Sequence, residues 1–255
     1  MAYNKIGIVG ATGLLGQELT RALVDEGYDV VPFSRQTTTV AGLPTQVLKS
    51  LVGFDVVIST VGHRGMKEQI PLIQQAKRDG VKRFVPSEFG IDPRAPAAQA
   101  DFFKPKREVF AALKAADFTD GWTAISSGFL DSVIPAFATF DSTSSTVKIH
   151  GNGDLQYPFA VRYDIGRILA YTFKHPKQYK DTWLAVANEW LSLKEIAQII
   201  KVKSGKELLM ENVGLDDSTP VLRLLEENGW STFSREDQTM DLPVKLADLK
   251  DYIDV

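Results

Sequence analysis

Three glycines at fixed spacing follow the first apolar run of the sequence. Gly10, Gly13 and Gly16 stand directly after Ile6–Val9 and directly before a run with helical spacing. Glycine at such positions allows a tight turn, a close approach of the backbone to a pyrophosphate, and contact between strand and helix. Backbone N–H groups at the start of the helix then face the anion. The segment therefore predicts a dinucleotide-binding loop, against the alternative of a purely structural turn. The loop residues expected to contact the cofactor are Gly10, Thr12, Gly13, Leu14, Leu15 and Gly16.

The next expected strand, Asp29–Phe33, is followed by Ser34 and Arg35. In a dinucleotide-binding fold this position reads the adenosine ribose, where an acidic side chain favours NAD and a basic one accommodates the 2′-phosphate of NADP. Arg35 can form charge-assisted hydrogen bonds to a phosphate, whereas Asp29 stands too early in the strand to reach the ribose. We therefore expect Ser34 and Arg35 to contact NADP(H). The alternative is that Arg35 is an ordinary loop arginine.

Few groups in the sequence are available for acid–base or nucleophilic catalysis. There is no cysteine, which excludes thiolate chemistry and cysteine-ligated metals, and there are only three histidines. The His-Glu-x-x-His and Gly-x-Ser-x-Gly motifs of zinc and serine hydrolases are absent, and no metal site is expected. The Tyr-x-x-x-Lys pair of short-chain dehydrogenases is absent as well. Four positions after Tyr157, Tyr163, Tyr171 and Tyr179 stand Val161, Arg167, His175 and Trp183.

Short β-branched runs alternate with helical patterns in the first half of the chain, which is typical of βαβ units and a parallel sheet. The central run 56–58 is apolar throughout, as expected for a strand with helices on both faces. We therefore predict an α/β fold of the Rossmann type, with a doubly wound parallel sheet. The expected strands are Ile6–Val9, Asp29–Phe33, Asp55–Thr60, Arg83–Pro86 and Thr123–Ser126, and helices are expected around residues 15–23, 70–76 and 109–116.

The second half of the chain is less regular, although residues 165–170 show a helical pattern. We place a boundary near Asp131, between an NADP-binding domain over residues 1–130 and a smaller C-terminal substrate-binding lobe over residues 131–255 that is partly interleaved with it. Ser192 and Glu195 form a capping box ahead of an apolar helical run. Residues 216–227 and 246–252 are expected to form terminal helices that line a pocket or cover the core.

Composition narrows the class of protein. The 255 residues are 44% hydrophobic and 24% charged, which is typical of a globular protein large enough to fold without disulfides or metal. The net charge of −3 does not suit a nucleic-acid-binding protein, and no apolar run is long enough to span a membrane. The start of the chain lacks the pattern of an export signal. We expect a cytoplasmic protein, a monomer or homodimer, with no nucleic-acid or membrane partner.

Four segments of the sequence together resemble one protein family. They are the glycine loop, Ser59–His63, Val81–Gly90 (Val-Lys-Arg-Phe-Val-Pro-Ser-Glu-Phe-Gly) and Lys106–Leu113. Their combination resembles the isoflavone reductase-like atypical short-chain dehydrogenases, which include phenylcoumaran benzylic ether and pinoresinol–lariciresinol reductases, within the NmrA-like superfamily. The resemblance is close over about residues 5–130 and looser beyond them, and the ten-residue segment is its most specific part.

The resemblance implies a catalytic role for Lys106. In that family a lysine in the frame Lys-x-x-Val-x-x-Ala-Leu/Ile, after the Ser-Glu-Phe-Gly segment, is the proposed general acid/base, and the frame selects Lys106 over Lys104. Phe89 is implied to lie near the nicotinamide. The further cofactor contacts expected from the family and from the strand ends are Thr60, Val61, Gly62, His63, Ser87, Glu88, Phe89 and Lys106. The expected substrate contacts are Phe89, Gly90, Ser127, Gly128 and Phe129.

The resemblance implies an NADPH-dependent reductase that transfers hydride to a small aromatic or conjugated substrate of isoflavone, benzylic ether or enone type. Two departures from the plant reductases leave the substrate open: the segment between Gly90 and Lys106 is short, and so is the C-terminal half. The alternative function is an NmrA-like redox sensor that binds NADP without turnover and acts through a protein partner. Three residue roles also stay open: Lys106 as a surface lysine, His63 as a proton donor, and Phe129 as a core residue.

Overall fold

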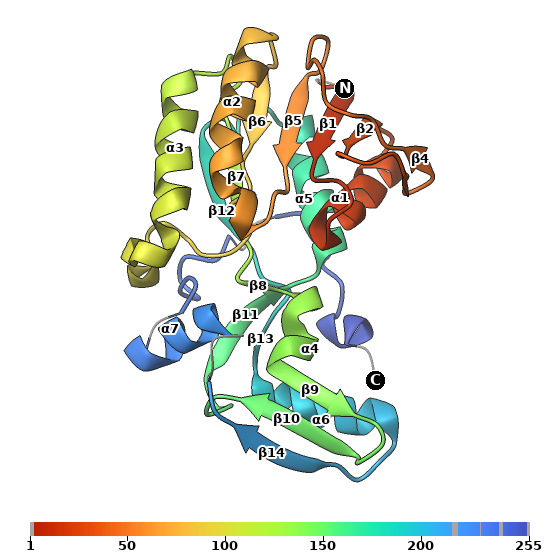
Figure 1. Cartoon of the computed structure of the whole chain (residues 1–255), viewed down its shortest axis with the longest axis vertical. Coiled ribbons are helices and arrows are strands. Elements are labelled where there is room, and N and C mark those ends of the chain that lie inside the picture. The colour runs from red at the N-terminus through yellow and green to blue at the C-terminus, as the bar shows by residue number, and fades with distance from the viewer. Residues whose placement is uncertain (1–2, 216–218, 230, 240–241, 254–255) are drawn as a thin grey trace.

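A parallel sheet with helices on both faces forms the upper part of the molecule in Figure 1. The computed structural model describes residues 3–215, 219–229, 231–239 and 242–253. Four strands stand in the order β2-β1-β5-β6, with every neighbouring pair parallel. A parallel bridge between Phe84 and Trp122 brings β7 beside β6, and β12 pairs in parallel with β7. These strands are β1 (Lys5–Val9), β2 (Asp29–Phe33), β5 (Val56–Ser59), β6 (Arg83–Val85), β7 (Thr123–Ser126) and β12 (Thr182–Ala185).

Helices cover the two faces of this sheet in pairs. On one face Leu19 of α1 and Leu169 of α5 pack with Ile8 of β1. On the other face Ile73 of α2 packs in a core with Val57 of β5, to which α3 also contributes. The predicted doubly wound α/β sheet is confirmed. The helices are α1 (Leu14–Asp25), α2 (Gln69–Arg78), α3 (Lys104–Ala116) and α5 (Arg162–Lys174), and a short hairpin follows β2 with strands β3 (Thr39–Val40) and β4 (Leu43–Pro44).

Two three-stranded sheets and their helices form the lower part of Figure 1. One sheet has the order β13-β11-β8 and the other β14-β10-β9. The predicted capping box is confirmed at the start of α6, where the Ser192 side chain accepts from the Glu195 N–H and the Glu195 carboxylate accepts from the Ser192 N–H. The elements are β8 (Phe129–Leu130), α4 (Ile134–Phe137), β9 (Ala138–Asp141), β10 (Thr146–His150), β11 (Gln156–Ala160), β13 (Glu189–Ser192), α6 (Leu193–Ser204), β14 (Leu209–Val213) and α7 (Pro220–Asn228).

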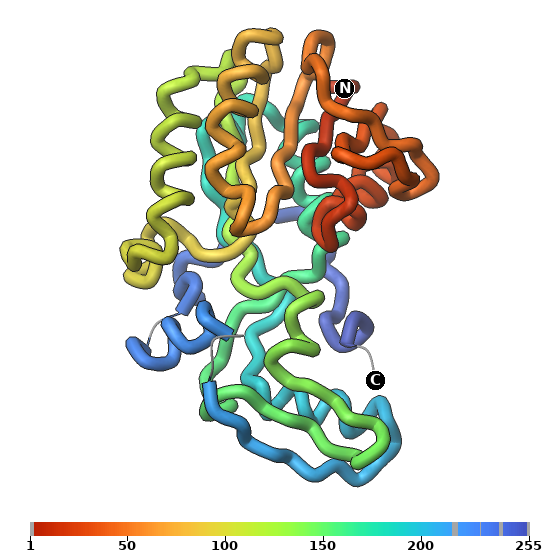
Figure 2. Tube along the Cα trace, in the orientation of Figure 1, coloured from red at the N-terminus to blue at the C-terminus, as the bar shows by residue number. Residues whose placement is uncertain are grey.

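The chain passes between the upper and lower parts several times, as the tube in Figure 2 shows. After β7 it descends through β8 to β11, returns to the sheet for α5 and β12, and descends again through β13 and α6. Residues after 131 therefore contribute to both parts. The sequence predicts a helical pattern in α5 but does not predict β12 as a sixth strand. A domain boundary near Asp131 stays a prediction.

The two terminal helices expected from the sequence have different outcomes. The one over 216–227 corresponds to α7, although its residues 216–218 lie outside the described residues. The one over 246–252 is wrong in extent, because only a 3-10 turn forms, at Leu249–Tyr252. Side chains hold the backbone of Ala247 instead: its N–H donates to Asp164 Oδ2 at 2.6 Å, and its carbonyl accepts from Asn188 Nδ2 at 2.9 Å.

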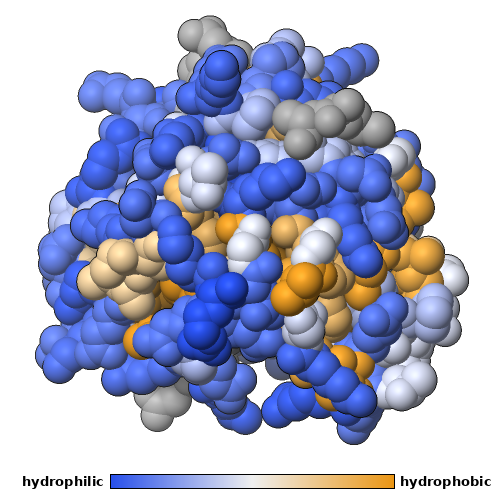
Figure 3. Space-filling model, turned by 90° about the horizontal axis from the view of Figure 1, so that it is seen from above, coloured by the Kyte–Doolittle hydropathy of each residue, from blue (hydrophilic) through white to orange (hydrophobic). Residues whose placement is uncertain are grey.

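The end of the molecule that lies uppermost in Figure 1 carries mostly hydrophilic residues. Figure 3 shows this face, with apolar residues in an interrupted band between the hydrophilic ones. Among the described residues, no helix is long and apolar enough to cross a membrane. The hollows that could hold a ligand lie elsewhere, along the opposite edge of the sheet.

Candidate active site

A pocket of about 820 Å³ lies at the carboxyl ends of β1, β2 and β5. Open α/β sheets bind ligands at this edge, because the loops that follow parallel strands meet there. The structure brings most of the predicted cofactor residues to the wall of this pocket, and we therefore call it the nucleotide pocket. They are Gly10, Thr12 and Gly13 of the glycine loop, Ser34 and Arg35 after β2, and Thr60, Val61, Gly62 and His63 after β5.

The glycine loop has the shape that a pyrophosphate requires. Gly10 has a φ of +86°, which L side chains rarely adopt. A Cβ on Gly16 would lie 2.4 Å from the Gly10 carbonyl oxygen, so loop and helix contact each other without room for a side chain. Gly13 caps α1 without a side-chain hydrogen bond, and the first turn of α1 has no acidic residue. The N–H groups at this helix start are thus available to an anion.

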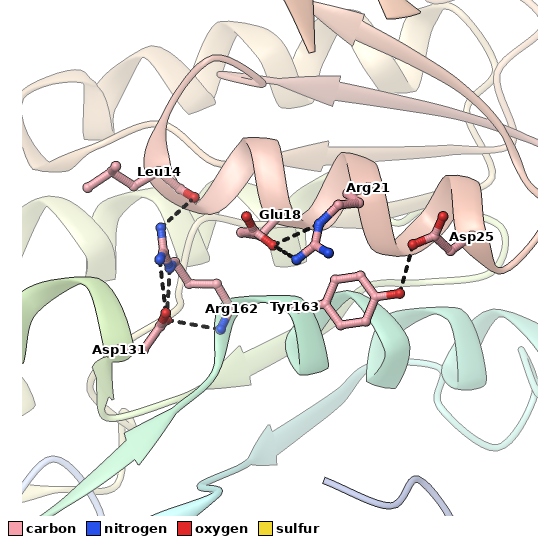
Figure 4. Close-up of polar contacts among 7 residues, drawn as sticks. All are labelled: Leu14, Glu18, Arg21, Asp25, Asp131, Arg162 and Tyr163. Atoms are coloured by element: carbon pink, nitrogen blue, oxygen red, sulfur yellow. Dashed lines mark hydrogen bonds and ion pairs between the residues drawn. The ribbon is translucent and has the colours of Figure 1, made fainter. Parts of the chain in front are cut away.

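Three residues of the predicted loop do not line the pocket. Leu15 packs against the core between the sheet and helices α1 and α5, and Gly16 contacts Gly10 as described. The side chain of Leu14 is exposed, and its carbonyl accepts a hydrogen bond from Arg162 Nη1 at 3.1 Å. Figure 4 shows that Arg162 also forms a two-pronged ion pair with Asp131, at 2.8 and 2.9 Å. The second half of the chain therefore holds the loop in place through Arg162.

Arg35 is exposed at the wall of the nucleotide pocket, as its proposed contact with a 2′-phosphate requires. Arg64 lines the same pocket and was not predicted from the sequence. In the described part of the chain neither guanidinium forms an ion pair with a carboxylate. Arg64 follows the predicted residue His63 directly, so its basic side chain was the available signal.

A second pocket, of about 400 Å³, lies between the sheet and the lower part of the molecule. We call it the cleft. Of the predicted substrate residues, Phe89, Gly90, Gly128 and Phe129 line it, and so does Lys106. Because His63 lines both the cleft and the nucleotide pocket, the two are adjacent.

Aromatic and aliphatic side chains form most of the cleft wall. Phe129 lines it and also packs on Phe137 and Tyr157, with ring centroids 4.8 and 5.4 Å apart, so it belongs to both cleft and core. The ring of His63 stacks on Phe102, with centroids 4.5 Å apart and planes 8° from parallel. Such a wall favours a flat apolar ligand, since stacked or edge-on rings attract one another beyond simple burial.

Lys106, which lines the cleft, forms an ion pair with the buried Glu88. Lys106 Nζ donates to Glu88 Oε2 at 3.0 Å, and the side chains are 15% and 3% exposed. Burial raises the pKa of the Glu88 carboxyl, and the positive charge of Lys106 opposes that rise. Both residues also line a smaller pocket of about 230 Å³. Glu88 does not line the nucleotide pocket or the cleft, and contacts the site through Lys106.

Two of the three predicted serines, Ser87 and Ser127, lie behind the pocket walls. The Ser87 N–H donates to Gln69 Oε1 and its hydroxyl donates to the Val61 carbonyl, both at 2.8 Å, so Ser87 joins the loops after β5 and β6. Ser127 is fully buried, and its hydroxyl oxygen has no hydrogen-bond partner among the described residues. Neither serine lines the cleft or the nucleotide pocket.

The C-terminal part of the chain supplies cleft residues that the sequence did not single out. Thr219, Pro220 and Val221, at the start of α7, line the cleft, and so does the buried Thr232. The available signal was the helical pattern over 216–227, which the sequence predicts to line a pocket or to cover the core. For Thr232 the sequence carried none.

The chain matches the model of the NmrA-like family over residues 43–221. The protein belongs to the NmrA-like family. This NmrA-like protein is 27% identical to oxidoreductase aprR of Aspergillus flavus, over 85% of this chain and 80% of that protein. It is 29% identical to phenylcoumaran benzylic ether reductase PT1 of Pinus taeda, over 80% of this chain and 76% of the other. The resemblance found in the sequence is confirmed.

Solved structures show the same relationship. The NmrA-like chain superimposes on leucoanthocyanidin reductase from Vitis vinifera in complex with NADPH, with a TM-score of 0.70 and 25% identity. The match covers 88% of this chain and 81% of that one. These three relatives are named reductases or an oxidoreductase, and the structural neighbour was solved with NADPH.

Proposed function

We propose that this protein is an NADPH-dependent reductase that transfers hydride to a small aromatic or conjugated substrate, with Lys106 as the proton donor. The observation that carries the proposal is the position of Lys106. Its side chain lines an aromatic cleft directly beside the nucleotide pocket and is paired with a buried carboxylate. A surface lysine on an amphipathic helix has no reason to occupy such a position.

The residues at the nucleotide pocket fit NADP(H). The glycine loop and the start of α1 would hold the pyrophosphate, and Arg35, with Arg64 on the same wall, would neutralise the 2′-phosphate. Thr60–His63 would lie along the cofactor toward the cleft. When bound, NADPH supplies the hydride. Lys106 then donates a proton to the oxygen on which negative charge develops, and the apolar cleft wall excludes water from that transfer.

The cleft favours an aromatic or conjugated substrate. The lining residues include Phe89, Phe102, Phe103, Phe129 and Phe137, while polar residues are few. The names of relatives in the family point the same way, since they include pinoresinol, phenylcoumaran benzylic ether and leucoanthocyanidin reductases. We therefore propose benzylic ethers, isoflavones and enones as the first compounds to test.

Lys106→Ala tests this function against a matched control, Lys104→Ala, an exposed lysine at the start of the same helix. NADPH binding is first measured by fluorescence titration, and NADPH oxidation is then followed in the presence of the substrate panel. We expect Lys106→Ala to lower kcat about 100- to 10,000-fold with little change in NADPH affinity, and Lys104→Ala to have wild-type activity. Unchanged turnover in Lys106→Ala would remove Lys106 from catalysis. Tight NADPH binding without turnover in the wild type, across the whole panel, would favour the redox sensor.

A further inference from the structure

Glu88 lies in the loop that follows β6, between a residue fixed by hydrogen bonds and two residues of the cleft wall. On one side Ser87 is fixed by hydrogen bonds to Gln69 and to the Val61 carbonyl. On the other side Phe89 and Gly90 line the cleft. Glu88 lies between a fixed anchor and the cleft wall, and its side chain turns away from the cleft toward the small pocket.

The Lys106 side chain lies between two hollows. It lines the cleft on one side and the small pocket on the other, whereas Glu88 lines only the small pocket. Lys106 Nζ therefore donates its 3.0 Å hydrogen bond to a Glu88 oxygen that does not belong to the cleft wall. The ammonium group has two further N–H donors besides this bond, and the side chain that carries it lines the cleft.

No other carboxylate among the described residues lines either hollow. The other charged or titratable groups there are Arg107 and Lys114 of α3, in the small pocket, and His63 after β5, in the cleft. All three are basic, so none of them compensates the charge of Lys106. Among the described residues that line the two hollows, Glu88 therefore supplies the one negative charge beside the ammonium group of Lys106, whose side chain is 15% exposed.

The Glu88 carboxylate makes a hydrogen bond to no other described side chain. Its second oxygen, Oε1, is buried and has no hydrogen-bond partner among the described residues. A buried carboxylate that served only to stabilise the loop would be expected to accept bonds from nearby backbone N–H groups. Here the contact with Lys106 is the interaction that accounts for the position of the group.

We propose that Glu88 is a positioning residue, which holds Lys106 at the cleft wall and keeps it in the protonated form that donates to the substrate. Glu88 does not itself touch the substrate or the cofactor. The inference rests on the proposed function of Lys106. It reassigns Glu88 from the expected cofactor contact to the support of the proton donor.

Glu88→Gln tests the proposal, because it keeps the shape and an acceptor oxygen but removes the charge. Glu88→Asp keeps the charge on a shorter side chain. The matched control is Glu108→Gln, on the exposed side of α3, where the carboxylate pairs with Lys67. Each variant is first compared with the wild type by thermal melting and by NADPH titration.

The pH profile of kcat separates the proposed role from a purely structural one. In Glu88→Gln the alkaline limb is expected to move about one to three pH units lower, because Lys106 loses its counter-charge. At pH 7 we expect kcat to fall about 10- to 100-fold, with NADPH affinity within about twofold of the wild type. Glu88→Asp is expected to restore the alkaline limb, and Glu108→Gln to leave it unchanged. A lower kcat in Glu88→Gln with an unmoved alkaline limb would overturn the proposal.

A second measurement does not depend on turnover. Acetic anhydride modifies neutral amines, so the protein without cofactor is treated at pH 7.5 and the acetylation of Lys106 is measured by mass spectrometry, with Lys104 as internal reference. We expect Lys106 to react at least about threefold faster in Glu88→Gln than in the wild type. Equal rates would overturn the role of Glu88. Absence of NADPH oxidation by the wild type, with the acetylation difference present, would instead count against the proposed function.

Discussion

Loss of the Arg162–Asp131 ion pair should lower the free energy of unfolding, because both side chains are largely buried. Asp131 is 4% exposed and Arg162 is 20% exposed, and two side-chain hydrogen bonds join them. Removing one partner of a buried pair costs about 3–5 kcal/mol, because the remaining charge is left without compensation. In Arg162→Met the Asp131 carboxylate keeps one donor, the backbone N–H of residue 162, at 3.1 Å. We therefore expect Arg162→Met to lower the free energy of unfolding by about 3 kcal/mol, the lower limit of that range.

Asp131→Asn should lower the free energy of unfolding by less, about 2 kcal/mol, because the more exposed guanidinium of Arg162 can be hydrated once it is unpaired. The double variant removes both charges, so its loss is expected to be about 3 kcal/mol rather than the sum, a coupling of about 2 kcal/mol. Urea unfolding at pH 7 measures each value. The control is the exposed pair Lys194–Asp154, 48% and 68% exposed, whose removal should cost less than about 1 kcal/mol.

The same variant tests whether Arg162 supports the glycine loop. Arg162→Met removes the hydrogen bond to the Leu14 carbonyl. A hydrogen bond of this kind contributes about 1 kcal/mol, so NADPH should bind about fivefold more weakly. Additive stability losses in the double variant, together with unchanged NADPH affinity, would refute both the buried pair and its connection to the loop.

Three further variants test single residues. Arg35→Asp should weaken NADPH binding about 10- to 100-fold and NADH binding far less, since charge-assisted bonds contribute about 1.5–3 kcal/mol; an equal loss for both cofactors in a fluorescence titration would contradict the assignment. Gly16→Ala should destabilise the protein by about 1–3 kcal/mol in urea unfolding, because the new Cβ would lie 2.4 Å from the Gly10 carbonyl oxygen; wild-type stability would show that the loop can yield. Burial raises the pKa of Asp55, but hydrogen bonds from Lys82 and two backbone N–H groups outweigh it and lower the pKa. This contribution is present above the unfolded pKa of about 4 and is lost as the pH falls, so Asp55→Asn should be less stable than the wild type at pH 7, and urea unfolding at pH 3 should show a smaller difference; a pH-independent difference would contradict this.

The sheet and its covering helices could be predicted because their signals are local. Apolar runs such as 56–58 are buried on both faces, and the helical spacing of Leu19 and Leu23 places both in the core. The glycine loop was also predictable, since strand, loop and helix are consecutive. β12 was not, because residues 182–185 carry no alternation and become a strand only by pairing with β7.

The composition of the candidate site could be predicted better than its geometry. The family resemblance selected Lys106 and Glu88 from their motifs, but no pattern along the chain shows that their side chains meet across 18 positions. Leu15 and Gly16 belong to the loop motif, yet the turn places one against the core and the other against Gly10. The cleft wall from α7 depends on how a distant segment packs, and this is decided by tertiary contacts alone.

The pairing of α1 with α5 has a consequence for synthesis of the protein. The Tyr28 hydroxyl, just after α1, donates to the Ala170 carbonyl of α5, 142 positions later. A ribosome adds about 5–20 residues per second, so the apolar face of α1 stays without its covering helix for about 7–30 s during synthesis. Contacts this distant along the chain also slow folding after release. During that interval the nascent chain presents Leu19 and Leu23 to its surroundings, and the yield of protein in a cell is expected to depend on chaperones that cover such surfaces.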